Sequence, residues 1–230
     1  MNLPTAPSLE LRGVSCARHG AVISSLDFEL TQRGFHVLTG EEGAHELLLR
    51  LLGLLESPDS GTVHFRGENT SAQDDARRAA LRTTSFGYAF AAPFLLPSLT
   101  VIENLAMPLF KLMETSASDA RTRAENLLEF VGLGGHEEER AGDLPPPLQY
   151  AAALARALIT QPEVLIVEGL DRNLTGSDLA HYTALLRQVV TRMGVTVIGS
   201  ASPAWQAGPG DYVLDVTESS VRAGAPVVAS

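Results

Sequence analysis

The sequence predicts an α/β domain with a mixed, largely parallel sheet, antiparallel strands near the N-terminus and an inserted helical subdomain. Short apolar runs alternate with helical patterns along the chain, as in sheets covered by helices on both faces. An apolar run, a glycine turn and a helical pattern follow one another over residues 35–55, which is the layout of a phosphate-binding loop. Helical patterns gather between residues 72 and 160, which indicates the subdomain. With 230 residues, the chain is predicted to form one such domain over residues 1–230.

The first expected strands differ in their patterns. Leu9–Val14 and Asp27–Leu30 alternate apolar and polar side chains, as half-buried strands do. The turn Gln32-Arg33-Gly34 then leads into Phe35–Thr39, whose apolar composition indicates a buried strand. The helical run Glu46–Leu55 is apolar on almost every side, so we expect it to be buried.

The middle of the chain is mostly helical. Ser118 is a candidate N-cap, because the residues after it place Ala120, Ala124 and Leu127 on one face. Leu148–Leu158 is rich in alanine, which favours a helix. The remaining expected helices are Ala72–Leu81, Val101–Met113, Ser118–Val131 and Leu179–Met193, and the remaining strands are Thr62–Phe65, Ser85–Ala92, Val164–Val167 and Val195–Ile198.

Composition excludes several classes of protein. A formal net charge of −10 argues against non-specific nucleic-acid binding, which needs a basic surface. No apolar run is long enough to span a membrane and the N-terminus lacks a signal-peptide pattern, so we expect a cytoplasmic protein without direct membrane insertion. A single cysteine, Cys16, excludes an internal disulfide. The dispersed histidines lack metal-ligand spacing, so no metal site is expected.

The order of these segments resembles the P-loop NTPase-like nucleotide-binding domain of ABC transporters over almost the whole chain. It is most similar to the group that serves lipoprotein-releasing, macrolide-efflux and cell-division transporters. The resemblance is carried by Leu95-Leu96-Pro97-Ser98-Leu99-Thr100-Val101, Glu103-Asn104-Leu105, Pro108, Ser60-Gly61, Ala155-Arg156-Ala157-Leu158, Pro162 and Asn173-Leu174. It implies ATP and Mg²⁺ as cofactors, a membrane permease as partner and a dimer that buries ATP between its subunits.

The phosphate-binding loop is degenerate. The matching stretch is Gly40-Glu41-Glu42-Gly43-Ala44-His45-Glu46-Leu47, where Glu46 stands for the lysine and Leu47 for the hydroxyl residue. A lysine replaced by Glu46 turns roughly 4 kcal/mol of attraction to a phosphate about 4 Å away into repulsion. We interpret the carboxylates of Glu41, Glu42 and Glu46 as caps of the following helix, and His45 as a solvated residue at its start.

The other family motifs are replaced as well. The Q-loop glutamine aligns with Ala91, and the signature loop with Leu144–Leu148, in which Pro145, Pro146 and Pro147 remove amide donors. Glu168 could still reach a metal, but Gly169 leaves the general-base position empty. Gly199-Ser200-Ala201-Ser202-Pro203 contains no switch histidine, and Thr175 replaces the D-loop aspartate. Asp171 is interpreted as a turn residue, with recruitment as a base as the alternative.

We therefore expect a pseudo-ATPase with no catalytic residues and no cofactor, which binds ATP and Mg²⁺ only weakly or not at all. The expected role is a scaffold or regulator of a lipoprotein- or macrolide-type permease complex, peripheral to the inner membrane. Phe94, Leu95, Leu96 and Leu99 are the candidate permease contacts, with packing inside the domain as the alternative. The chain could pair with itself or with an intact ABC subunit. Two other functions remain open, an ATPase that uses Glu168 and Asp171, or an interaction module detached from transport.

Overall fold

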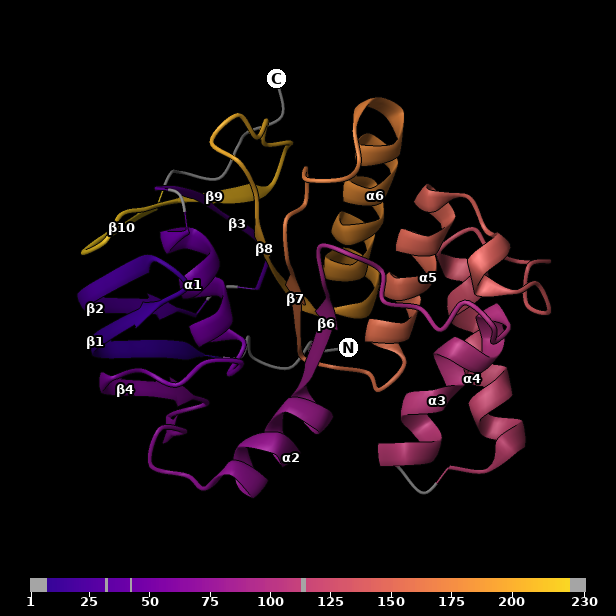
Figure 1. Ribbon diagram of the computed structural model, residues 1–230, viewed down its shortest axis with the longest axis horizontal. Helices are drawn as coiled ribbons and strands as arrows, with labels where there is room; N and C mark the ends of the chain where they lie inside the picture. The colour runs from indigo at the N-terminus through magenta and orange to yellow at the C-terminus, as the bar shows by residue number, and fades with distance from the viewer. Residues whose placement is uncertain (1–7, 32, 42, 113–114, 224–230) are drawn as a thin grey trace.

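The computed structural model describes residues 8–31, 33–41, 43–112 and 115–223. Two sheets form the frame (Figure 1). The smaller is antiparallel in the order β2-β1-β4-β5, and the larger has the order β10-β9-β3-β8-β7-β6. The smaller comprises β1 (Leu9–Arg18), β2 (Ala21–Leu30), β4 (Ser60–Phe65) and β5 (Glu68–Asn69). The larger comprises β3 (Phe35–Gly40), β6 (Phe86–Ala89), β7 (Val164–Val167), β8 (Thr196–Ser200), β9 (Asp211–Val216) and β10 (Val221–Ala223).

The larger sheet is parallel from β6 through β7, β8 and β3 to β9, and only β10 runs antiparallel to its neighbour. The predicted α/β fold with a mixed, largely parallel sheet and N-terminal antiparallel strands is therefore confirmed. The sheet extends further than expected, because β9 and β10 were not predicted. The turn at Gln32 and the end of the helix at Met113 lie outside the described residues.

The described residues form six α-helices. They are α1 (Ala44–Leu52), α2 (Asp75–Ser85), α3 (Val101–Leu112), α4 (Ala117–Phe130), α5 (Pro146–Leu158) and α6 (Gly176–Gln188), with a short 3₁₀ turn at Ala141–Asp143 and a π turn, Val189–Met193, after α6. Helices α3, α4 and α5 pack together at the side of the molecule away from β1, β2 and β4 (Figure 1). That residues 72–160 form an inserted subdomain of a single domain 1–230 stays a prediction.

Two hydrophobic cores cover the two faces of the larger sheet. Along β7, Val164 and Ile166 pack into the core that contains α1 and the smaller sheet. Leu165 and Val167, which alternate with them, pack into the core formed with α3, α4, α5 and α6. Because both faces are covered, this strand is apolar throughout, as its sequence predicted.

The N-cap of α4 differs from the prediction. Ser116, rather than Ser118, accepts the hydrogen bond from the backbone N–H of Asp119, at 3.1 Å. Ser118 lies in the first turn instead. Both serines are followed by the same apolar face, so the pattern could not distinguish them, and the helix begins slightly earlier than expected.

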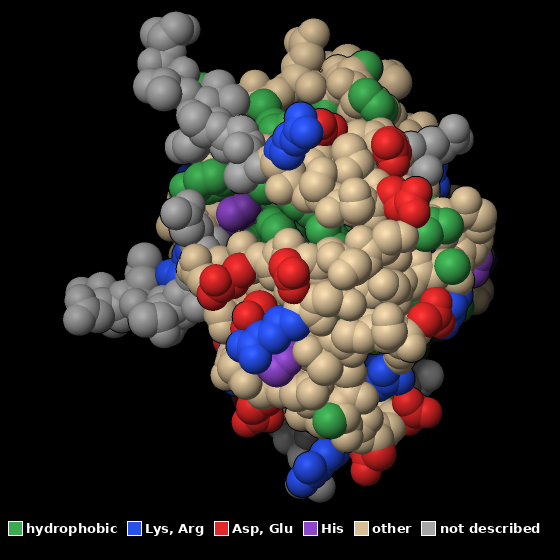
Figure 2. All heavy atoms as spheres, turned by 90° about the vertical axis from the view of Figure 1, so that its left-hand side faces the viewer, with side chains coloured by type: hydrophobic (Ala, Val, Ile, Leu, Met, Phe, Trp, Pro, Cys, Tyr) green, Lys and Arg blue, Asp and Glu red, His purple; other side chains and the backbone are tan. Residues whose placement is uncertain are grey.

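The end of the molecule formed by the smaller sheet carries acidic and basic side chains next to each other (Figure 2). Two ion pairs within that sheet and its flanking turn join Arg12 to Glu10 and Arg18 to Asp59, with the closest nitrogen and oxygen atoms 2.6 Å apart in each. Positive charge is thus neutralised locally, and this end is not a basic surface of the kind that binds a phosphate backbone.

A buried ion pair anchors β9 to α6. Asp211 is fully buried, and its carboxylate accepts bonds from the Arg187 guanidinium at 2.9 and 2.7 Å and from the Gly208 N–H at 2.7 Å. The carboxylate beside it raises the pKa of Arg187, so the guanidinium stays charged throughout the accessible pH range. A buried aspartate at the start of a strand does not fit an apolar pattern, which is why β9 was missed.

Replacement of Asp211 should destabilise the fold. We expect Asp211→Asn to lower the free energy of unfolding by about 3 kcal/mol, because Arg187 would keep a poorly hydrated charge without its partner. Urea denaturation measures the change. Asp215→Asn, on an exposed position of the same strand, is the matched control and should alter stability by less than about 0.5 kcal/mol. Equal effects of both substitutions would contradict the anchoring role.

Candidate functional site

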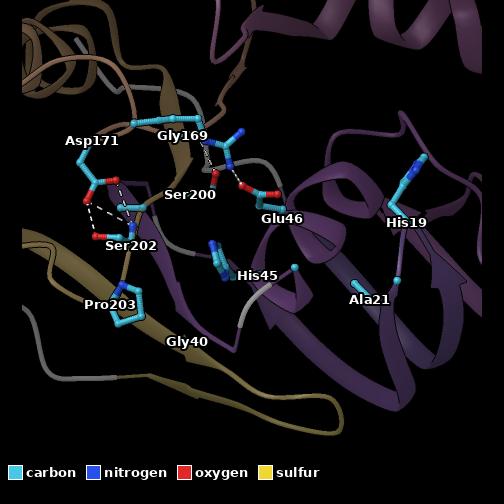
Figure 3. A pocket seen from close by; sticks show the side chains of 14 residues that line it. His19, Ala21, Gly40, His45, Glu46, Gly169, Asp171, Ser200, Ser202 and Pro203 are labelled. Atoms are coloured by element: carbon cyan, nitrogen blue, oxygen red, sulfur yellow. Dashed lines mark hydrogen bonds and ion pairs between the residues drawn. The ribbon is translucent and has the colours of Figure 1, made fainter.

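A cavity of about 820 Å³ opens at the carboxyl ends of the parallel strands. Parallel sheets place ligand sites at this edge, because loops from several strands converge there. The cavity lies between the glycine turn after β3, the loop after β7, the segment after β8 and the β1–β2 turn (Figure 3). Its described lining residues are His19, Gly20, Ala21, Gly40, Gly43, His45, Glu46, Gly169, Asp171, Arg172, Ser200, Ala201, Ser202 and Pro203.

The turn between β3 and α1 requires glycine at two positions. Gly40 and Gly43 have φ values of +124° and +80°, which favour glycine. A Cβ on Gly40 would lie 2.2 Å from the Val216 carbonyl oxygen, so a side chain has no room there. Helix α1 begins at Ala44, directly after the turn. The predicted strand, turn and helix are present, although the side chains have changed.

Three side chains at the start of α1 have surroundings that the sequence did not reveal. Glu46 forms an ion pair with Arg172 from the loop after β7 (Figure 3). His45 is buried, with its Nδ1 atom 2.9 Å from the Glu41 carbonyl oxygen, so its interpretation as a solvated residue is wrong. Leu47 is also buried in the core with α1, and offers no hydroxyl to the cavity.

The capping interpretation of the acidic residues is wrong for Glu41. The N-cap of α1 is Gly43, which has no side chain to cap the helix. The Glu41 carboxylate instead accepts a bond from the Glu218 N–H at 3.0 Å, which ties the turn to the segment after β9. Glu42 lies outside the described residues. Glu46 is in the first turn of α1, where its charge suits the helix dipole, but its partner is Arg172.

The loop after β7 holds the two positions expected for metal and base. Glu168 faces α1, where Arg50 lies 3.2 Å from its carboxylate. Arg50 also lies 3.4 Å from Glu56, so it bridges two acids. Gly169 has a φ of +62° and donates its N–H to the Ser200 hydroxyl at 2.9 Å. The carboxylate that remains is thus held by an internal cation, and the next position has no side chain.

Asp171 and the segment after β8 are joined by hydrogen bonds. The Asp171 carboxylate accepts from the Ser202 N–H at 3.0 Å and from its hydroxyl at 2.5 Å (Figure 3). The two residues are 31 positions apart, so Asp171 ties the loop after β7 to the segment after β8, and its interpretation as a turn residue stays a prediction. The segment after β8 is where the family's switch histidine is expected. The cavity does contain a histidine near these residues, His45, but it comes from α1.

Ala91 lies beside Gly169, because a Cβ on that glycine would come within 3.4 Å of the Ala91 Cβ. The Ala91 carbonyl accepts from the Tyr150 hydroxyl at 3.0 Å and from the Asn173 amide at 2.7 Å. Burial raises the pKa of Tyr150, which keeps this donor protonated. The positions aligned with the Q-loop glutamine and the general base are thus neighbours, and neither carries a functional group.

The three prolines lie outside this cavity. Pro145 is the N-cap of α5, and Pro146 and Pro147 form its first turn, where a missing N–H costs least. None of them is among the described residues that line the cavity with Gly40 and Glu46. Their position agrees with the structural interpretation of a stiff start to α5. Any contact with a nucleotide held by a second subunit stays a prediction.

The segment before α3 presents two apolar side chains to solvent. Phe94 is 68% exposed and Leu96 46%, whereas Leu95 packs against the core and Leu99 is half-buried. Of the four candidate permease contacts, Phe94 and Leu96 are thus exposed to a partner, whereas Leu95 and Leu99 are partly buried within the chain. Their docking role stays a prediction.

Hydrogen bonds fix this segment. Arg156 from α5 donates to the Phe94 carbonyl at 2.7 Å and to the Pro93 carbonyl at 2.8 Å. Burial lowers the pKa of its guanidinium. Phe94 has a φ of +45°, a strained conformation for a bulky residue that these bonds hold in place. Buried Asn104 accepts from the Leu96 N–H at 2.7 Å and donates to its carbonyl at 3.0 Å.

Neither a metal cluster nor a membrane-spanning helix is present among the described residues. No group of three or more His, Cys, Asp or Glu side chains in that part of the chain is arranged to hold a metal ion. No helix within it is both long and apolar enough to cross a membrane.

Comparison with known proteins identifies relatives of this chain among ABC transporter proteins. The sequence model of the ABC transporter family matches residues 23–168. The lipoprotein-releasing system ATP-binding protein LolD of Myxococcus xanthus is 37% identical over 73% of this chain and 75% of its own length. LolD of Anaeromyxobacter dehalogenans is 31% identical over 89% of this chain and 86% of its own length.

Solved structures show the same fold. A dimeric structure of the ATP-binding cassette MJ0796, bound to ADP and Pi, has a TM-score of 0.79 at 20% identity and covers 94% of this chain and 97% of its own. CbiO1 of Clostridium perfringens, part of an ABC transporter complex, has a TM-score of 0.82 at 19% identity, with 94% and 87% covered.

These relatives correct the expectation that the chain takes no cofactor. That prediction of no ATP and no Mg²⁺ is wrong, since the family match and the LolD relatives identify ATP-binding proteins. That prediction was based on the replaced side chains of the phosphate loop and of the other family motifs, and did not consider what the backbone and other loops still provide. The glycine turn and a cavity of about 820 Å³ remain, and Arg172 supplies a cation that the sequence analysis did not place there. The Glu46 and Leu47 side chains do not fit the usual phosphate and metal ligands, so any phosphate contact depends on other residues.

The ion pair across the cavity should contribute little to stability. Glu46 is 32% and Arg172 51% exposed, and such pairs contribute about 0.2–1 kcal/mol. We therefore expect a double-mutant cycle of Glu46→Gln and Arg172→Gln to give a coupling free energy below about 1 kcal/mol. Urea denaturation of the wild type, both single variants and the double variant provides the measurement. A coupling above about 2 kcal/mol would mean that the pair is structural.

Proposed function

The chain belongs to the ABC transporter family, and we propose that it is a non-catalytic ATP-binding subunit of a membrane permease complex of the lipoprotein-export type. In this role it acts as a scaffold or regulator, at the cytoplasmic surface of the membrane through its partner. The observation that carries the proposal is Gly169. The family's general base is expected at this position, and glycine cannot polarise a water molecule.

The surroundings of Gly169 support the loss of hydrolysis. The sequence offered Glu168 and Asp171 as substitutes for the missing base. Glu168 is paired with Arg50, and Asp171 is bonded to Ser202. Each carboxylate is engaged by a partner within the chain and would have to leave that partner to position a water molecule. These bonds weigh against the alternative of an atypical ATPase.

The permease contact is supported by Phe94 and Leu96. Both are exposed, although large apolar side chains favour burial, and Arg156 and Asn104 hold their backbone rigidly. A preordered apolar segment loses little entropy on binding, which suits a docking surface. LolD relatives are named as parts of a lipoprotein-releasing system, and we infer a permease of that kind as the partner. The dimer, with itself or with an intact ABC subunit, is proposed on the same resemblance.

Hydrolysis is the direct test. We expect the purified chain to release no phosphate from Mg-ATP above the buffer blank, because the base position is empty. Glu46→Lys restores a cation at the phosphate loop and should remain inactive for the same reason. Phosphate release is measured beside an active ATPase as positive control. Turnover by either protein at the rate of that control would contradict the non-catalytic role.

Docking is tested by charge substitution in the exposed segment. Phe94→Asp should reduce the amount of chain that co-purifies with the permease about tenfold or more, because it places a carboxylate in an apolar contact. Val22→Asp is the matched control, since Val22 is 41% exposed on β2, and it should leave co-purification unchanged. Thermal unfolding checks that both variants fold. Loss of folding in Phe94→Asp would instead assign the segment to the core, whereas a folded variant that still co-purifies would exclude this surface.

A further inference from the structure

We propose that Arg172 is the phosphate-binding cation of the cavity, and that Glu46 competes with the bound nucleotide for its guanidinium. The inference rests on the proposed function, because it specifies how that ATP-binding site recognises its ligand. It concerns a residue in the loop after β7, not one in the glycine turn where the family's lysine is expected.

Arg172 is the strongest source of positive charge in the cavity. Among the described lining residues it is the only lysine or arginine, beside the two histidines His19 and His45. His45 is buried against the Glu41 carbonyl, and His19 is exposed on the β1–β2 turn. An anionic ligand of this cavity therefore has Arg172 as its main electrostatic partner. Its planar guanidinium can bond two phosphate oxygens at once.

In this structure the Arg172 guanidinium is paired with the Glu46 carboxylate. Glu46 lies in the first turn of α1 and forms an ion pair with Arg172, which lines the same cavity. The Glu46 carboxylate is thus an internal anion near the helix N-terminus, where a phosphate group would also be favoured. The pair joins two elements that border the cavity, namely α1 and the loop after β7.

The pair can be exchanged at low cost. Both side chains keep contact with solvent, at 32% exposure for Glu46 and 51% for Arg172, so neither charge becomes stranded when the pair opens. A phosphate group carries more charge than one carboxylate and also accepts two bonds from arginine. Nucleotide binding can therefore move Arg172 from Glu46 to the ligand, while the Glu46 carboxylate turns towards solvent.

The competition gives two substitutions opposite effects on affinity. Glu46→Gln removes both the competitor and a negative charge, so the Kd for ATP should fall about tenfold or more. Arg172→Gln removes the phosphate partner, so the Kd should rise about tenfold or more. Arg172→Lys keeps the charge without the planar fork and should fall between Arg172→Gln and the wild type. A residue with only a structural role would not give this order.

Calorimetric titration of the full chain with ATP in the presence of Mg²⁺ measures these affinities. Arg77→Gln, on α2, and Glu125→Gln, on α4, are matched controls remote from the cavity and should leave the Kd unchanged. Adenosine is the second probe. It lacks phosphate, so its affinity should respond to neither Glu46→Gln nor Arg172→Gln. Thermal unfolding of each variant checks that it is folded.

Two opposite shifts in affinity decide the outcome. Tighter ATP binding by folded Glu46→Gln together with weaker binding by folded Arg172→Gln supports the inference. An unchanged Kd in either variant, equal changes for adenosine, or no binding by any variant at millimolar ATP overturns it. Hydrolysis of ATP by the wild type would contradict the proposed function and leave this inference standing, because the inference is judged on affinity alone.

Discussion

The site depends on one steric constraint, which is that Gly40 has no room for a side chain. This residue ends the strand β3, which pairs with β8 on one side and β9 on the other, so a Cβ there would meet the Val216 backbone. The chain must therefore leave the sheet through glycine with a positive φ, and α1 begins at Ala44 after the short turn. The need for glycine at this position follows from strand pairing, so it does not depend on the replaced lysine and hydroxyl positions of the loop.

Internal partners have taken the place of ligands around this loop. Glu46 contacts Arg172, Glu168 contacts Arg50, and the Asp171 carboxylate contacts Ser202. Each of these acids is neutralised or hydrogen-bonded within the chain, which lowers the cost of gathering acids at one sheet edge. The fold thus remains satisfied without the side chains that the family uses for hydrolysis. The chain can therefore lack the side chains used for hydrolysis and keep its fold, because the strands and hydrophobic cores are formed by other residues.

The sequence predicted most of the sheet, because buried parallel strands such as Val164–Val167 are continuous apolar runs. It missed β9, which begins at a buried aspartate whose partner lies on α6. It also missed the cation of the cavity, since Glu46 and Arg172 are 126 positions apart and no local pattern links them. His45 was expected to be solvated for a similar reason, because its burial depends on how the turn folds around it and not on a local pattern. Periodicity reports which face of an element is buried, whereas a site also depends on which loops converge after folding.

The bonds from Arg156 to the carbonyls of Pro93 and Phe94 have a mechanical consequence. They join the segment before α3 to the far end of α5, a helix of 13 residues that begins in a proline-stiffened turn. The Phe94 backbone therefore cannot shift without breaking both bonds or displacing the last turn of α5. A partner that contacts Phe94 thus meets a segment whose position is set by the same helix that begins at the three prolines.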